Sequence, residues 1–92
     1  MIVSFEHKGL REFYLTGTTK GIQVKHRSKL RNILVVLDSI KNINDANFPS
    51  FKLHKLKGNQ KDKWSIWVSG NWRITFIFND GDVHIVNYVD YH

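Results

Sequence analysis

The chain has 92 residues, enough for one small domain, and 14 lysines and arginines against 8 acidic residues give it a formal net charge of +6. The absence of cysteine excludes disulfide scaffolds, cysteine-bound metal centres and thiol nucleophiles. Hydrophobic residues make up 41% of the chain, which favours a folded protein over a disordered one. The basic surplus favours a polyanionic partner, with nucleic acid ahead of anionic membranes.

No apolar run approaches the roughly 20 residues of a membrane span. The first residues also lack the basic and apolar regions that make up a signal peptide. We therefore expect a cytoplasmic protein without a membrane partner, folded as a single domain over residues 1–92.

The first half of the chain predicts one short strand and two helices. Residues 2–5 are apolar and flanked by charge, which is typical of an edge strand. Residues 7–16 have a helical apolar pattern that ends before Gly17, a common helix-terminating residue. Apolar residues recur at helical spacing between residues 22 and 40, where residues 25–31 add a basic flank.

Beyond Pro49 the apolar pattern changes to the period of two that is typical of strands. Residues 41–49 read as a loop with at most one helical turn. The Asp80-Gly81 pair predicts a tight hairpin, because it accepts positive φ angles. The result is an α+β domain with two N-terminal helices packed on one face of a mainly antiparallel sheet. The expected strands cover residues 51–54, 64–68, 72–78 and 83–89.

The usual cofactor and nucleophile motifs are missing from the sequence. There is no glycine-rich phosphate loop and no serine in a nucleophile elbow. Asp80 and Asp82 are two residues apart, but the hairpin turn explains both. We therefore expect neither a metal nor a cofactor.

The five histidines differ in context. His7, His26 and His84 have the context of surface residues. His54 alternates with the apolar residues around it, so it should point away from the core, within the basic stretch of residues 52–57. A solvated strand face explains this segment taken alone. His92 ends either a frayed terminus or a continued strand.

Arg73 should lie on the strand face opposite to its apolar neighbours, where an exposed arginine is the simpler interpretation. If Arg73 shares that face with His54 and His92, the two histidines, the arginine, nearby lysines and a tyrosine form a metal-free set for cleaving RNA. Histidine suits both proton transfers because its pKa lies near neutrality. Cations stabilise the extra negative charge of the phosphorane. DNA would not be a substrate, because this route needs the 2′-OH.

Three motifs follow one another along the chain: Leu53-His54-Lys55-Leu56-Lys57-Gly58, Asn71-Trp72-Arg73 and Asp90-Tyr91-His92. Together they resemble the HigB toxins of the RelE superfamily, which are bacterial toxin–antitoxin endoribonucleases. The resemblance covers nearly the whole chain, with a departure at Lys55, where relatives often carry proline.

This resemblance implies a RelE-like microbial ribonuclease fold and an enzyme that cuts mRNA in the ribosomal A site. By the same resemblance, His54, Asp90, Tyr91 and His92 would be catalytic. We favour His92 as general base, His54 as general acid and Arg73 on the scissile phosphate. Asp90 would orient or balance a histidine, and Tyr91 would stack on a base or bind the phosphate. The residues expected to bind RNA are Lys52, Lys55, Lys57, Trp67 and Asn71.

The resemblance also implies a partner, a HigA-type antitoxin with a helix-turn-helix, through which alone the toxin would reach operator DNA. The basic residues 25–31 could meet this antitoxin or ribosomal RNA, and a merely solvated helix face is an equal alternative. Two other functions stay open. The protein could be a non-catalytic RNA- or ribosome-binding module with Trp67 and Tyr91 as stacking surfaces. It could also act only as a co-repressor with its antitoxin.

Overall fold

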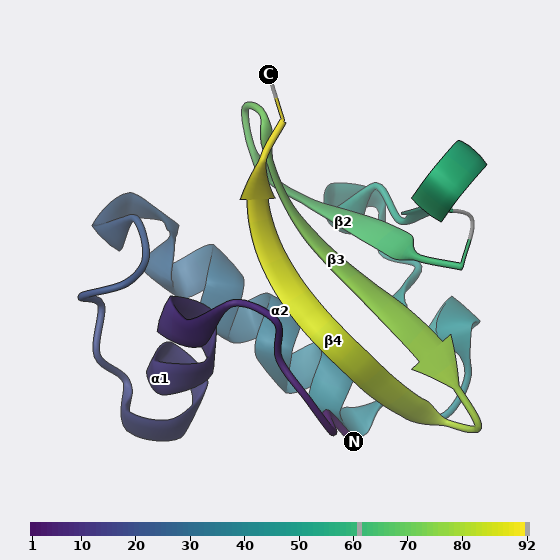
Figure 1. The fold of residues 1–92 in the computed structure, drawn as a ribbon, viewed down its shortest axis with the longest axis horizontal. Coiled ribbons are helices and arrows are strands. Elements are labelled where there is room, and N and C mark those ends of the chain that lie inside the picture. Colours follow the sequence, from purple (N-terminus) through teal and green to yellow (C-terminus); the bar gives the residue numbers. More distant parts are fainter. Residues whose placement is uncertain (61, 92) are drawn as a thin grey trace.

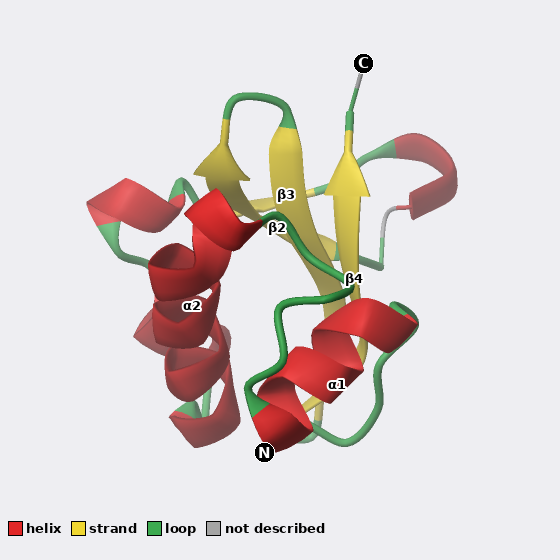
Figure 2. Cartoon of the chain, turned by 90° about the vertical axis from the view of Figure 1, so that its left-hand side faces the viewer, coloured by secondary structure: helices red, strands yellow, loops and turns green. Residues whose placement is uncertain are grey.

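The computed structural model describes residues 1–60 and 62–91. Over these residues both α-helices pack on the same side of an antiparallel sheet with the strand order β1-β2-β3-β4 (Figures 1 and 2). This confirms the predicted α+β class. The elements are α1 (Lys8–Thr16), α2 (Arg27–Ser39), β1 (His54–Lys55), β2 (Trp64–Ser69), β3 (Trp72–Asn79), β4 (Asp82–Asp90) and the 3₁₀ turns η1 (Val24–His26), η2 (Ile43–Ala46), η3 (Pro49–Phe51) and η4 (Gly58–Gln60).

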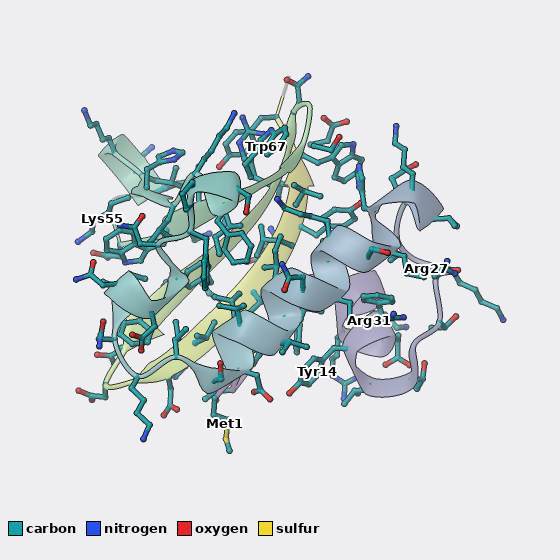
Figure 3. All side chains as sticks on the ribbon, turned by 180° about the vertical axis from the view of Figure 1, so that it is seen from behind. Met1, Tyr14, Arg27, Arg31, Lys55 and Trp67 are labelled. Carbon is teal, nitrogen blue, oxygen red and sulfur yellow. The ribbon has the colours of Figure 1, made fainter. Side chains whose placement is uncertain are left out.

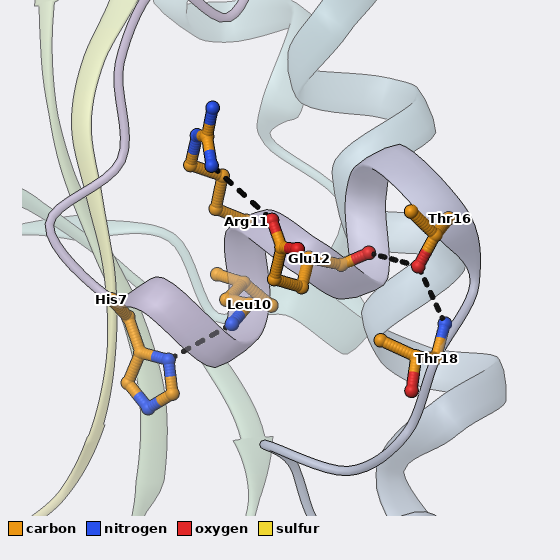
Figure 4. A network of polar contacts seen from close by, with 6 residues as sticks. All are labelled: His7, Leu10, Arg11, Glu12, Thr16 and Thr18. Atoms are coloured by element: carbon orange, nitrogen blue, oxygen red, sulfur yellow. Dashed lines mark hydrogen bonds and ion pairs between the residues drawn. The ribbon is translucent and has the colours of Figure 1, made fainter.

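Helix α1 is capped at both ends, close to the positions that the sequence predicts. The Nδ1 atom of His7 accepts a hydrogen bond from the Leu10 amide at 2.9 Å and so caps the first turn (Figure 4). Gly17 takes the left-handed conformation with φ of 81°, and its amide donates to the Phe13 carbonyl at 2.8 Å. The helix buries Leu10 and Phe13 against the sheet.

Helix α2 begins later than the apolar spacing predicts. Gln23 is extended, and η1 forms a tighter turn before the helix starts at Arg27. His26 ends this turn, is only 3% exposed and shares a hydrogen bond with Tyr88. The prediction that His26 lies on the surface was therefore wrong. A basic sequence context did not reveal that the turn directs this one ring inward.

The β3–β4 hairpin confirms the turn prediction. Asp80 and Gly81 have φ angles of 51° and 81°, the signs that a tight two-residue hairpin needs. Further along, β4 contains a bulge, where Ile85 takes a positive φ of 46°. The long strand curves, and its concave side faces away from α1 and α2 (Figure 1).

The N-terminal segment lies along the free edge of β4 and is shorter than the predicted strand. It forms two isolated parallel bridges, Ile2 with Val83 and Phe5 with Val86. Between them, Ser4 Oγ accepts a hydrogen bond from the Ile85 amide at 2.9 Å. The bulge in β4 interrupts a continuous ladder, so the segment covers this edge without becoming a regular strand.

The strand predicted over residues 51–54 was mostly wrong. Pro49 opens the turn η3 instead, and Lys52 adopts the left-handed conformation with φ of 47°. Only His54 and Lys55 pair with β2. The apolar alternation there reflects Phe51 entering the core at 1% exposure rather than an extended strand.

The hydrophobic core fills the space between the helices and the convex face of the sheet. The alternation along β3 buries Ile74 and Phe76, as the sequence predicts, and leaves Arg73 and Ile77 half-buried on the other face. No helix in residues 1–60 and 62–91 is long and apolar enough to cross a membrane.

Candidate active site on the concave face of the sheet

Strand register places His54 and Arg73 on the same face. His54 pairs with Ser65, and Trp67, two residues further along β2, pairs with Arg73. Directly opposed residues of antiparallel strands project to the same side, as do residues two apart on one strand. The concave face therefore carries an imidazole, an indole and a guanidinium on three adjacent strands.

Two small, buried hydroxyl residues lie at the centre of this face. Ser65 and Thr75 pair in register beside His54 and are 0% and 2% exposed. These two short hydroxyl side chains therefore form the base of the site. The longer side chains of His54, Trp67 and Arg73 lie on the same face.

His54 is exposed, and one of its ring nitrogens already has a partner. Its Nδ1 lies 3.2 Å from the carbonyl oxygen of Lys52. A carbonyl can only accept, so this contact keeps the proton on Nδ1 and leaves Nε2 as the basic nitrogen of the neutral ring. A protonated ring would then present an Nε2–H donor to a ligand on the sheet.

Arg73 is fixed by the turn between β2 and β3. Its Nη1 donates to the carbonyl oxygens of Gly70 at 2.8 Å and Trp72 at 3.1 Å. The indole Nε1 of Trp67 donates to the same Gly70 carbonyl at 3.0 Å. The guanidinium has five N–H groups, so donors remain for an anion after these contacts.

The side-chain ammonium groups of two lysines lie over the aromatic ring of Trp67. The Nζ atom of Lys52 lies 4.4 Å from the ring centroid, and the Nζ atom of Lys29 lies 5.4 Å from it. Lys29 comes from α2 and was not among the residues expected to bind RNA. The sequence places it only on the basic flank of the helix, and helical spacing carries no signal that its side chain reaches the sheet.

The chain end runs beside the start of β3. The amide of Tyr91 donates to the Asn71 carbonyl at 2.9 Å, which extends the pairing beyond β4. Tyr91 and Asn71 are both exposed here. Asp90 pairs with Trp72 and so lies on the face opposite to Arg73. His92, the favoured general base, lies outside the described residues.

Two of the expected RNA-binding lysines lie apart from this cluster. Lys55 pairs with Trp64 and points to the face opposite His54, with its Nζ 5.6 Å from the Trp64 ring centroid. Lys57 is exposed in the segment that follows β1, where it lines a shallow hollow with Gly58 and Asp62. The structure brings Lys52, but not Lys55, to the face of His54 and Arg73.

Within the described part of the chain, Lys29, Lys52 and Arg73 form no ion pair with a carboxylate. Burial lowers the pKa of Lys29, and the positive charge of Lys52 lowers it further. Like charges held together without a counter-ion attract an anion, and this face can stabilise negative charge on a phosphate.

Both the sequence and the fold of this chain match known proteins. Residues 3–92 match the model of the HigB-like toxin family, described as the RelE-like toxin HigB of type II toxin–antitoxin systems. The chain is 44% identical over 92 residues to the endoribonuclease HigB of Proteus vulgaris, with all of both chains covered. It also resembles the solved structure of the YoeB dimer from Staphylococcus aureus, with a TM-score of 0.61 at 19% identity, over 99% of this chain and 94% of that one.

The structural likeness supports the RelE-like fold. The two sequence matches span essentially the whole chain. A type II toxin has an antitoxin as its partner. The chain therefore belongs to the HigB family of RelE-like toxins of type II toxin–antitoxin systems.

Proposed function

We propose that this protein is an endoribonuclease that cuts mRNA in the ribosomal A site and so inhibits translation. The observation that supports it most is the common face of His54 and Arg73, which puts a proton-transfer group near a phosphate-binding cation. The full-length relative named as an endoribonuclease supports the same activity.

The reaction begins at the ribose 2′-OH next to the scissile phosphate. A general base takes its proton, and the 2′-oxygen attacks the phosphorus. The bond from phosphorus to the 5′-oxygen breaks, and a general acid protonates that oxygen. The products are a 2′,3′-cyclic phosphate and a 5′-OH, with each catalytic group left in the opposite protonation state. Each positioned proton transfer contributes roughly 10²- to 10⁴-fold.

We assign His54 as general acid, because its Nδ1 contact with Lys52 directs the opposite nitrogen outward. Arg73 stabilises the phosphorane with the N–H groups that its backbone contacts leave over. His92 is the proposed general base. Asp90 orients or balances a histidine, and Tyr91 stacks on a base or donates to the phosphate.

The remaining expected residues bind the RNA strand. Lys52 and Trp67 lie next to Arg73 on the concave face. Asn71, just before β3, accepts a backbone hydrogen bond from Tyr91. Lys55 and Lys57 contact RNA further from the scissile bond. A HigA-type helix-turn-helix antitoxin neutralises the toxin, and operator DNA is reached only through it. The toxin acts in the cytoplasm, where the message is translated.

Induced expression of the wild type beside His54→Gln and His92→Gln tests this function, with primer extension on a translated reporter message. The tag must be N-terminal, because a C-terminal tag displaces His92. We expect growth arrest and cuts within translated codons for the wild type, and neither for the two variants.

Arrest that persists in both variants without any cuts would overturn the assignment. It would favour a non-catalytic ribosome-binding protein, because such a module needs cations and aromatic rings but no proton-transfer groups.

A further inference from the structure

The basic residues of α2 do not form one surface. Arg31 lines an apolar groove between the two helices with Tyr14 and Val35 (Figure 3). Lys29 instead extends toward Trp67, which lies with the sheet in the same view. Lys29 and Arg31 therefore lie in different surroundings, and they can contact different partners.

Lys29 is held in its position by three contacts. Its Nζ donates to the Ser50 carbonyl at 2.9 Å and lies 5.5 Å from the Phe51 ring centroid as well as 5.4 Å from that of Trp67. The side chain is half-buried. An unrestrained lysine would extend into water, so this packing fixes an ammonium beside the sheet at a cost in side-chain entropy.

The position of Lys29 is electrostatically unfavourable unless an anion binds. Lys52 lies over the same indole ring, and Arg73 is paired with Trp67 in the sheet. Within the described residues no carboxylate pairs with any of these three cations. Aromatic rings offset part of the repulsion through their negative faces, but they do not neutralise the charge.

We propose that Lys29 and Lys52, held over Trp67 beside Arg73, form a subsite for a backbone phosphodiester next to the scissile one. Arg73 then holds the scissile phosphate, and the two lysines hold its neighbour in the strand. This subsite rests on the proposed function, since it needs an RNA strand across the concave face.

A polyanionic strand fits this subsite better than a protein carboxylate does. Three cations lie around one aromatic ring on the face that carries His54, which is the usual composition of a surface that binds single strands. An acidic segment of the antitoxin is the other possible occupant, and the experiment separates the two.

Fluorescence anisotropy with a short 2′-O-methyl RNA tests the subsite, because that probe keeps its phosphates and cannot be cleaved. We expect Lys29→Gln to weaken binding roughly three- to tenfold and to lower the slope of log affinity against log salt by about 0.7. Lys29→Arg should restore the slope. Lys8→Gln, which removes the same charge from an exposed position of α1, should leave it unchanged.

Several results would overturn the subsite. These are an unchanged salt slope in Lys29→Gln, an equal change in Lys8→Gln, or no binding of the probe by the wild type at low salt. If Lys29→Gln weakens binding to a glutamate-rich peptide but leaves RNA binding unchanged, Lys29 contacts a protein partner instead. Cleavage of reporter mRNA by the wild type is scored separately, so failure of the subsite is distinguishable from failure of the endonuclease.

Discussion

His26 and Tyr88, 62 residues apart in the sequence, share a buried hydrogen bond of 2.5 Å between Nδ1 and the phenol oxygen. The Gln23 amide donates to the same oxygen at 3.4 Å, so the phenol proton is available to His26. Tyr88 also stacks on Trp72 with ring centroids 4.4 Å apart. These contacts connect the start of α2 to the end of β4, two residues before Asp90.

Tyr88→Phe should destabilise the protein by about 1–3 kcal/mol, because it leaves a buried His26 nitrogen without its partner. At roughly 4–8 °C per kcal/mol for a domain of this size, the loss is visible as a lower Tm. Thermal unfolding followed by circular dichroism measures it. Tyr91→Phe, at an exposed position, should leave Tm unchanged. Equal Tm values for wild type and Tyr88→Phe would show that the bond contributes nothing.

Acid should destabilise the fold through His26. Burial lowers the pKa of His26 below its ordinary value of 6.5, and the charge of Lys25 lowers it further. The unfolded chain therefore binds the proton first as pH falls. The stabilising contribution is complete above pH 6.5 and is lost as pH falls from there toward the lower folded value.

Free energies of unfolding measured between about pH 5 and 8 test this dependence, across the range in which histidine titrates. His26→Asn removes the titrating ring and should give a flatter profile than the wild type. Burial also lowers the pKa of His7, so His7→Asn, which keeps a capping side chain, should flatten the profile too. A profile of unchanged steepness in both variants would contradict the account.

Ser65→Ala should stabilise the protein by about 1 kcal/mol, because a buried hydroxyl without a partner costs free energy. Ser65 is 0% exposed, and its Oγ has no hydrogen-bond partner among the described residues. Denaturant unfolding with a constant m-value measures the change. A clear loss of stability would mean that this hydroxyl does make a stabilising bond.

Gly9→Ala should destabilise the protein although alanine is the better helix former by about 1 kcal/mol. A Cβ built on Gly9 would lie 2.5 Å from the Gly21 carbonyl oxygen, and backbone cannot move aside cheaply. We expect a net loss of about 1–3 kcal/mol. Lys8→Ala, one residue earlier on the exposed side, serves as the control. A higher Tm for Gly9→Ala would show that the two segments separate easily.

Local patterns predict most of the fold because the elements have short-range causes. Gly17 ends α1 and Asp80-Gly81 closes the hairpin for reasons of backbone geometry alone. The errors arise where tertiary contacts override local preference. His26 lies in a basic run but fills a space beneath Tyr88, and Phe51 enters the core from a 3₁₀ turn rather than from a strand.

The site is predictable only in part for the same reason. Alternation along strands places His54 and Arg73 on the outer face, and register then brings them together. Register also separates Lys55 from His54, since adjacent residues of one strand point to opposite faces. Lys29 has no such signal, because its contact with Trp67 depends on how α2 packs against the sheet.

Cleavage of ribosome-bound mRNA with a single 2′-deoxy sugar before the cut site tests the central claim most directly. Attack by the 2′-oxygen predicts that the deoxy message stays intact. It also predicts that the all-ribose message gives an upstream fragment ending in a 2′,3′-cyclic phosphate, and that His54→Gln cuts neither message. Cleavage of the deoxy message, or an upstream fragment with a 3′-OH, would contradict the mechanism built on His54 and Arg73.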